Sequence, residues 1–527
     1  MKKFIYSAAI LILISASGCK KWLDVNVNPN NPQVVSPNLY LGPMQTNLAF
    51  SQQYDGRYIG KYIQNWSEYT ASDTWDRHGY LFSSSDPASE QWRTVYFLLG
   101  YNLIDMMRIS EQEERWDLLG IGYCLKAIGW QHLTDTHGEL ILKQAFDQSR
   151  KTFDYDTQEE VYVEIQRLLD LAITNLKRTD GKVNQAYLAT TDAIFQGNRE
   201  RWLRFAYGLK AINLNHLSNK GAMYKPDEII AAVDLAMTGN ADNAKFKFSA
   251  AGSTSSNFYG PQRGNLTTFR QTTFFVNLMN GNQFGGAVDP RLKRLLFPST
   301  DGNVYGIEPT YGYGTSAANQ RPLLNFWGTT ASGANLSGNY IFNDKSSFPI
   351  MTYSELQFIK AEAAFRKGDK PTALDAYKKG IDAHIDFVNQ ANAESANSTV
   401  TQITPAEKTA FLASAAVPTD PANLKLGDIM LQKYIALWGW GINETWADLR
   451  RYHYIDADPS APAATQVYRG FAIPAADRIF SENGNKPAYR LRPRYNSEWV
   501  WNIDAFEKIG GKRLDYHTIP IWIATAP

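Results

Sequence analysis

Residues 353–385 read YSELQFIKAEAAFRKGDKPTALDAYKKGIDAHI, and this stretch decides the fold. Its first half carries two apolar rows at helical spacing: Leu356, Ile359 and Ala363, then Phe358, Ala361 and Phe365. Gly368 and Asp369 end that pattern, and a second apolar face begins at Ala373. The sequence therefore predicts two helices that fold back on each other at Gly368.

Small and bulky residues in this pair follow the spacing of a tetratricopeptide repeat. Ala361, a turn at Gly368, Ala373 and then Tyr377 fall where that repeat alternates small and large positions. Small residues at these positions let the two helices approach closely. Other helical segments fit the repeat only loosely, so we expect a mainly α fold in which degenerate helix pairs stack side by side.

Helical periodicity also covers much of the N-terminal half, from Leu39 to about Lys61, from Gln91 to Arg108 and in two stretches between 115 and 176. The second of those stretches places one apolar face at Val161, Ile165, Leu168, Leu169 and Ala172. Cys124 lies in the first among apolar neighbours, so we expect a buried small hydrophobe. The HLTDTHG that follows lacks further metal ligands nearby and is expected to be a turn.

Two long segments have no helical period. Residues 65–90 form one polar and aromatic stretch, and residues 251–349 form a second that is rich in Gly, Ser, Thr and Asn. Loops of this length inside a compact protein are usually functional or disordered. Their aromatic content argues against disorder.

The composition narrows the class of protein. In a chain of 527 residues, 53 Lys and Arg balance 52 Asp and Glu, so the charge does not favour nucleic acid or an anionic membrane surface. The chain carries 14 Trp, 29 Tyr and 26 Phe at a mean hydropathy of −0.37, which leads us to expect many rings near the surface. The 2 cysteines provide no disulfide framework.

The N-terminus has the parts of an export signal in residues 1–18. Lys2 and Lys3 precede an apolar run that is too short to cross a bilayer, and small residues follow it. A cysteine at that point, Cys19, is the attachment site that a lipoprotein peptidase requires, although Ala16 stands where a typical lipobox has leucine. We expect residues 19–38, rich in Asn and Pro, to form an extended tether to one body at 39–527.

The order of the motifs resembles the SusD/RagB family of nutrient-binding outer-membrane lipoproteins, nearly from end to end. The segments that carry the resemblance are KKWLDVNVNPNNP, HLTDTHGELIL, FDYDTQEEVYVEI, DAIFQGNRERWLRFAYGLKAINLNHL, VDPRL, TYSELQFIKAEAAFRKGD, LQKYIALWGWGINETWADLRRY and RPRYNSEWVWN. Each segment alone is a weak signal. Their order and spacing together are specific.

The resemblance implies an α-helical lipoprotein on the outer face of the outer membrane, anchored by lipid. Such a protein caps a SusC-like TonB-dependent β-barrel transporter, binds oligosaccharide or peptide at the junction and releases it inward. The family forms its ligand face from loops, here residues 65–90 and 251–349, while its repeat helices mainly contact the transporter.

Sugars dock their C–H faces on aromatic rings and need planar polar partners for their hydroxyl groups. The first loop offers Trp75 and Tyr80 as platforms, with Asp73, Asp76 and Arg77 as hydrogen-bonding neighbours. The second offers Tyr311, Tyr313 and Trp327, with Arg321 and Asn325 nearby. The alternative for each ring is that it packs its own loop onto the helices, since large aromatic side chains are mostly buried.

Catalytic motifs are missing from the sequence. It has no HExxH, no GxSxG and no glycine-rich phosphate loop, and sequence alone cannot pair the two carboxylates that a glycosidase needs. We therefore expect a non-catalytic glycan-binding protein without cofactor or metal. A peptide-binding protein of the RagB type and an α-helical surface glycosidase remain the alternatives.

Overall fold

The computed structural model describes residues 35–81, 86–312, 323–329, 337–394 and 400–527. The expected signal peptide, Cys19 and most of the tether lie outside the described residues. The longer helices are α2 (Leu41–Tyr62), α4 (Gly100–Gln112), α5 (Trp116–His137), α6 (Gln158–Lys177), α8 (Arg199–Asn215), α9 (Pro226–Leu235), α12 (Tyr353–Lys367), α13 (Lys370–Ala393), α15 (Leu426–Leu437) and α16 (Ile442–Arg451).

Shorter elements complete the fold. The short α-helices are α3 (Glu90–Arg93), α7 (Gln185–Ala189), α10 (Thr273–Asn277), α11 (Leu292–Leu295), α14 (Pro405–Leu412) and α17 (Ile503–Lys508). Among the described residues the strands are β1 (Trp66–Glu68), β2 (Ala244–Phe246), β3 (Phe269–Gln271) and β4 (Phe348–Met351). The prediction of a mainly α fold is confirmed.

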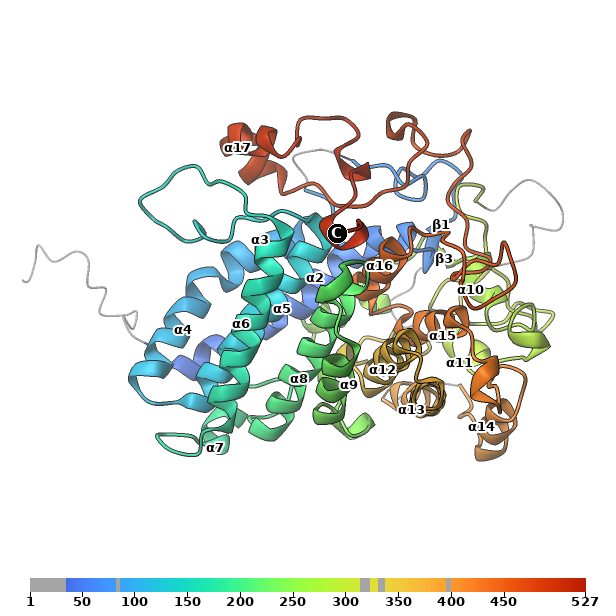
Figure 1. Ribbon diagram of the computed structural model, residues 1–527, viewed down its shortest axis with the longest axis horizontal. Helices are drawn as coiled ribbons and strands as arrows, with labels where there is room; N and C mark the ends of the chain where they lie inside the picture. Colours follow the sequence, from blue (N-terminus) through green and yellow to red (C-terminus); the bar gives the residue numbers. More distant parts are fainter. Residues whose placement is uncertain (1–34, 82–85, 313–322, 330–336, 395–399) are drawn as a thin grey trace, which may run out of the picture.

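Helix pairs stack in sequence order. α5 packs on α6, α6 on α8, α8 on α9, α9 on α12 and α12 on α13, so neighbours in the chain are neighbours in space (Figure 1). Loop-rich segments gather at one end and along the top of this row, around β1, β3 and α10 in the view of Figure 1. Within the described residues, no helix has both the length and the apolar character that crossing a membrane requires.

The predicted helix pair is formed by α12 and α13. Thr352 and Glu355 close a reciprocal capping box at the start of α12, and Gly368 ends that helix in the left-handed conformation at φ 91°. Close approach of the two helices rests on Gly380, because a Cβ there would lie 2.8 Å from the Phe358 ring. The pattern around Gly368 thus predicted the turn, and Gly380 is a further position at which a small residue lets the helices approach, beside the fully buried Ala361 and Ala373.

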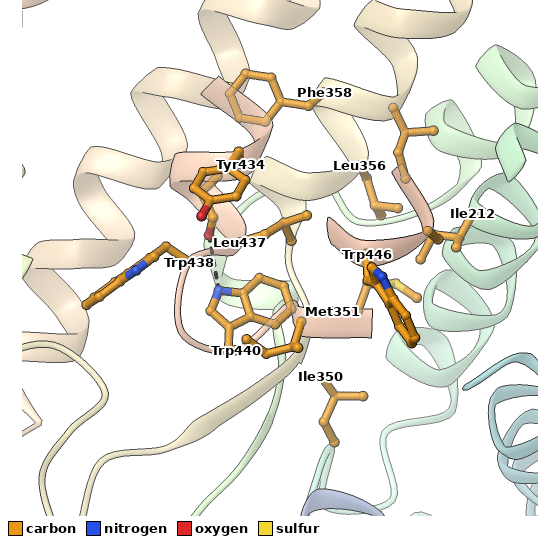
Figure 2. Packing of buried hydrophobic residues seen from close by; sticks show 14 of the residues in the cluster. Ile212, Ile350, Met351, Leu356, Phe358, Tyr434, Leu437, Trp438, Trp440 and Trp446 are labelled. Carbon is orange, nitrogen blue, oxygen red and sulfur yellow. Dashed lines mark hydrogen bonds between the residues drawn. The ribbon is translucent and has the colours of Figure 1, made fainter. Parts of the chain in front are cut away.

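Rings from the loop segments are part of the core. Trp438 is fully buried and stacks on Phe275 at 4.3 Å, and Phe326 and Tyr340 pack around the same indole. Figure 2 shows Trp438 and Trp440 on the chain after α15, with Trp446 facing Leu356 and Met351 nearby. The expectation that many rings lie near the surface is therefore wrong for most rings in the segment between α9 and α12. These rings pack inward and hold the irregular backbone of that segment against α15.

A buried ionic network connects α12, α15 and α16. Lys433 lies 2.6 Å from Glu444 and 2.8 Å from Asp448, and Arg451 lies 2.9 Å from Glu362. All five side chains are buried. Burial lowers the pKa of Lys433, but Asp448 and Glu444 raise it more, so this lysine stays charged in the core.

The HLTDTHG segment is helical rather than a turn. α5 continues to His137, where the hydroxyl of Thr136 donates to the carbonyl of His132 at 2.7 Å. The apolar face before it extends the helix beyond the point at which the sequence predicts it to end. Cys124 is fully buried in the same helix, as predicted.

Candidate functional site

The two irregular segments of the sequence come together in space. β1 from residues 65–90 pairs antiparallel with β3 from residues 251–349, with Trp66 opposite Gln271 and Glu68 opposite Phe269. The Tyr69 amide then donates to the Thr268 carbonyl at 3.0 Å. Figure 1 places β1 and β3 side by side at the edge of the helical body. One face is thus built from both loops.

Two exposed tyrosines lie on adjoining parts of this face. Tyr69 is 38% exposed and Tyr311 is 47% exposed. Gly312, at φ 60°, lies against the backbone of residues 69–71, where a Cβ would be 2.6 Å from the Tyr69 carbonyl oxygen. The loop that carries Tyr311 therefore lies directly on the loop that carries Tyr69.

An arginine from a third segment completes this face. The guanidinium of Arg478 lies over the Tyr311 ring, 4.5 Å from its centre. Arg77 holds the segment in place by donating to the carbonyls of Arg478 at 2.9 Å and Ile479 at 3.3 Å. We call Tyr69, Tyr311 and Arg478 the tyrosine face. Both rings stay partly exposed although Arg478 lies over Tyr311 and Arg270 lies over Tyr69, and exposed rings beside a planar cation are groups that suit a sugar ring.

A charged cluster supports the loop behind the tyrosine face. Lys61 is buried and lies 3.0 Å from Asp73 and 3.2 Å from Glu68. Asp76 accepts the Glu68 amide at 2.8 Å. Burial raises the pKa of Asp76 to about 8, although Lys61 opposes that shift. Asp76 is 1% exposed and does not reach a ligand on the tyrosine face.

The other predicted residues of the first loop have structural contacts. Trp75 is 4% exposed and packs against Tyr58 at 4.8 Å, Tyr80 at 5.0 Å and Tyr62 at 5.4 Å. Tyr80 is 8% exposed. The expectation that Trp75 and Tyr80 present open platforms is therefore wrong, because rings from α2 cover Trp75, and Trp75 and His517 pack against Tyr80. Asp73 remains partly exposed at 21% of its side chain, close to the exposed part of the loop.

The predicted residues of the second loop that the structure describes also have structural contacts. Trp327 is 2% exposed and donates its indole N–H to the Tyr259 carbonyl at 3.0 Å. The side-chain oxygen of Asn325 accepts the amides of Trp327 and Thr329, which closes a local turn. Trp327 is thus not an open platform either. Tyr313 and Arg321 lie outside the described residues, and whether any of the predicted residues binds a ligand stays a prediction.

Two residues of the tyrosine face were missed by the sequence analysis. Tyr69 stands among small polar residues in SEYTAS, a pattern that favours an exposed ring. Arg478 had no local signal, because it reaches the face only through the bonds that Arg77 makes to its segment. Within the described residues, no three His, Cys, Asp or Glu side chains are grouped so that they could hold a metal ion.

The chain matches one family model across most of its length. That model is described as starch-binding and associating with the outer membrane, and it covers residues 29–470. A comparison with curated proteins gives no match.

Solved structures share the fold over nearly the whole chain. A SusD/RagB family protein from Bacteroides thetaiotaomicron superposes with a TM-score of 0.71 at 22% identity, covering 94% of this chain and 100% of its own. A chitin-binding SusD homologue from Flavobacterium johnsoniae gives a TM-score of 0.65 at 21% identity, with 93% and 99% covered. A SusD homologue from Bacteroides fragilis gives 0.68 at 18% identity, with 93% and 100% covered. Identities this low establish the fold alone.

Proposed function

This chain belongs to the SusD-like family, described as starch-binding and associating with the outer membrane, and on that basis we propose that it binds nutrient oligosaccharides without cleaving them. The observation that carries the proposal is the tyrosine face. Two loops, each with an exposed tyrosine, lie against each other at Gly312, and Arg478 lies over one of the two rings, in the loops to which the resemblance assigns the ligand face.

The arrangement of this face suits a sugar chain. Tyr69 and Tyr311 offer ring faces for the C–H side of pyranose rings, and Arg478 offers planar donors for hydroxyl groups. Asp73 adds a partly exposed carboxylate next to the first loop. The fold is shared with a SusD homologue that is described as chitin-binding, which supports oligosaccharide over peptide as the ligand.

We further propose that the protein delivers its ligand to a SusC-like TonB-dependent β-barrel transporter. In this proposal residues 1–18 are a signal peptide, Cys19 carries lipid, residues 19–38 are the tether and residues 39–527 form one body at the cell exterior. The order of motifs in the sequence supports these assignments.

The absence of cleavage is part of the proposal. Asp76, whose pKa burial raises to about 8, lies buried beneath the tyrosine face, whereas the pKa of Glu308, whose carbonyl accepts the Tyr311 amide, is raised by partial burial. A glycosidase needs an acid of this kind in contact with the scissile bond. Incubation with labelled oligosaccharides tests this point, and steady release of shorter products would contradict it.

Calorimetric titration of the purified protein with maltoheptaose, chitohexaose and a panel of short peptides tests the ligand class. We expect heat from an oligosaccharide and a loss of affinity in Tyr69→Ala and Tyr311→Ala. Leu235→Ala is the matched control, because Leu235 is 56% exposed on α9, outside the loops. Binding of peptides alone would favour the peptide-binding alternative.

A further inference from the structure

A pocket separate from the tyrosine face has the features of a second binding site. It has a volume of about 580 Å³ and lies between the start of the α3–α4 segment, the loop from α5 to α6 and the chain before α17. Figure 1 shows that long loop extending from the helical row near α3, with α17 above it. None of the residues that line the pocket belongs to the tyrosine face.

Irregular backbone gathers at this pocket. The π-helical turn Thr94–Leu99 supplies Tyr96 and Phe97, and a second π-helical turn, Tyr495–Trp499, supplies Ser497 and Glu498. These are the two π-helices of the described residues. Isolated π-helical turns occur frequently at functional sites. Their meeting at one pocket points to a site rather than to chance.

Phe146 adds a third irregularity. Its φ of 67° is left-handed, which is uncommon for a bulky residue and strains the backbone where it occurs. The ring lies 5.7 Å from Tyr101 and 6.3 Å from Tyr96, and its carbonyl accepts the hydroxyl of Tyr101. The strained residue therefore brings an aromatic wall into the pocket.

One aromatic wall of the pocket, Tyr96, is fixed in place before any ligand arrives. Tyr96 donates to the Ile141 carbonyl at 2.8 Å and accepts the Ile141 amide at 3.0 Å, and its ring packs on Trp92 at 4.9 Å. Phe97 is 70% exposed and Tyr101 is 42% exposed at the rim. A ring held as Tyr96 is held loses little conformational entropy on binding.

Polar groups alternate with these rings. Arg93 pairs with Glu90 at 2.9 Å, and Arg150 pairs with Asp147 at 3.1 Å, with both arginine side chains still more than 40% exposed. The lining thus offers exposed donors and acceptors beside aromatic faces without a large excess of one charge. An acyl chain would gain no hydrogen bond from the exposed arginine donors, whereas sugar hydroxyls would.

We infer that this pocket is a second carbohydrate-binding site, which takes one or two sugar units from the end of a neutral oligosaccharide. The ligand class is taken from the proposed function, and the inference rests on it. Two separated sites on one chain would each bind a short oligosaccharide, and a glycan long enough to reach both would be held at two points.

The experiment compares maltoheptaose and chitohexaose titrations of the wild type, Tyr311→Ala and two pocket variants. Phe97→Ala removes an exposed ring, and Ala145→Trp fills the pocket from a half-buried position. Leu235→Ala is again the control, and thermal unfolding of each variant checks its fold. We expect two binding sites per chain for at least one sugar, one lost in Tyr311→Ala and the other lost in Ala145→Trp. Phe97→Ala should weaken the pocket site by about fivefold or more.

The outcomes separate the two proposals. One site per chain that is abolished by Tyr311→Ala and unchanged by Ala145→Trp overturns the second site and leaves the proposed function standing. If binding is lost only in Ala145→Trp, the pocket is a sugar site and the proposed role of the tyrosine face is overturned. No binding of either sugar overturns both. The wild type could instead bind the apolar dye 1-anilinonaphthalene-8-sulfonate in the pocket, lose the dye site in Ala145→Trp and bind no sugar there. That result would overturn the carbohydrate assignment.

Discussion

Gly312 lies so close to Tyr69 that a Cβ at position 312 would stand 2.6 Å from the Tyr69 carbonyl oxygen. The contact joins the two loops that form the tyrosine face, and the φ of 60° at Gly312 also favours glycine. The spacing between Tyr69 and Tyr311 therefore depends on a position without a side chain.

We predict that Gly312→Ala separates the two loops and weakens oligosaccharide binding by about 1–3 kcal/mol, the range for loss of one stacking platform. Gly302→Ala is the matched control, because Gly302 also has a left-handed φ, 80°, but a Cβ at that position would have no other atom within 4 Å. Calorimetric titration with maltoheptaose measures both. Equal losses in the two variants would assign the effect to backbone conformation alone.

In the second loop Trp327 is buried and Tyr311 is exposed, so their replacement should change stability by different amounts. Trp327→Ala should lower the free energy of unfolding by about 3–5 kcal/mol, because it empties a buried indole site and leaves the Tyr259 carbonyl unpaired. Tyr311→Ala should change it by about 0.5 kcal/mol or less. Urea unfolding measures both values. A Trp327→Ala protein of unchanged stability that binds no oligosaccharide would instead place the indole in direct contact with ligand.

The helical scaffold could be predicted from sequence because its signals are local. The turn at Gly368 and the capping residues around Thr352 are set by neighbours a few positions away. Helix ends were less certain, as the continuation of α5 to His137 shows. There, packing of the helix extends it past residues that could equally form a turn.

The candidate site was only partly predictable because exposure depends on distant residues. Tyr69 and Trp75 belong to the same loop, yet Tyr58 and Tyr62 from α2 cover only Trp75. Arg478 is brought to the face by the bonds from Arg77, and no pattern in the sequence relates the two. The sequence singled out the two loops that lie against each other, but which of their rings stay exposed is decided by tertiary contacts.

The lipid anchor is a prediction from the N-terminus alone. If Cys19 carries lipid, Cys19→Ser should move the protein expressed in its native cells from the membrane fraction to the soluble fraction. Fractionation followed by immunoblotting measures this, and Cys124→Ser controls for loss of a thiol, since Cys124 is buried in α5. Wild-type partitioning of the Cys19→Ser protein would remove the lipoprotein assignment.

The buried ionic network should be essential for stability. Lys433→Met leaves Glu444 and Asp448 without their shared cation, and removal of one partner from a buried pair costs about 3–5 kcal/mol. Lys508→Met is the control. The Lys508 Nζ lies 2.7 Å from a carboxylate oxygen of Asp154, a distance similar to those around Lys433, but both side chains are more than half exposed. The control should cost far less, because water and salt screen an exposed ion pair. Similar unfolding free energies for the two variants would contradict a central role for Lys433.

Asp76 makes a specific contribution to the dependence of stability on pH. Burial raises its pKa in the folded protein to about 8, above the usual value of 3.8. The folded state therefore binds more protons than the unfolded state between these two values, so the contribution of this carboxyl falls as pH rises through that window. The slope for a single proton is about 1.4 kcal/mol per pH unit at most.

Asp76→Asn tests this contribution, because the amide resembles the protonated acid and keeps an oxygen for the Glu68 amide. We expect the variant and the wild type to have similar unfolding free energies near pH 4, and the variant to become the more stable of the two as pH approaches 8. Urea unfolding at intervals across this range measures the difference. Asp154→Asn is the control. The exposed carboxyl of Asp154 has a lowered pKa, mainly because Lys508 donates a hydrogen bond to it. The stabilising contribution of Asp154 is therefore lost as pH falls, the opposite direction to Asp76. A constant difference between Asp76→Asn and wild type across the range would show that Asp76 is ionised throughout, held charged by Lys61.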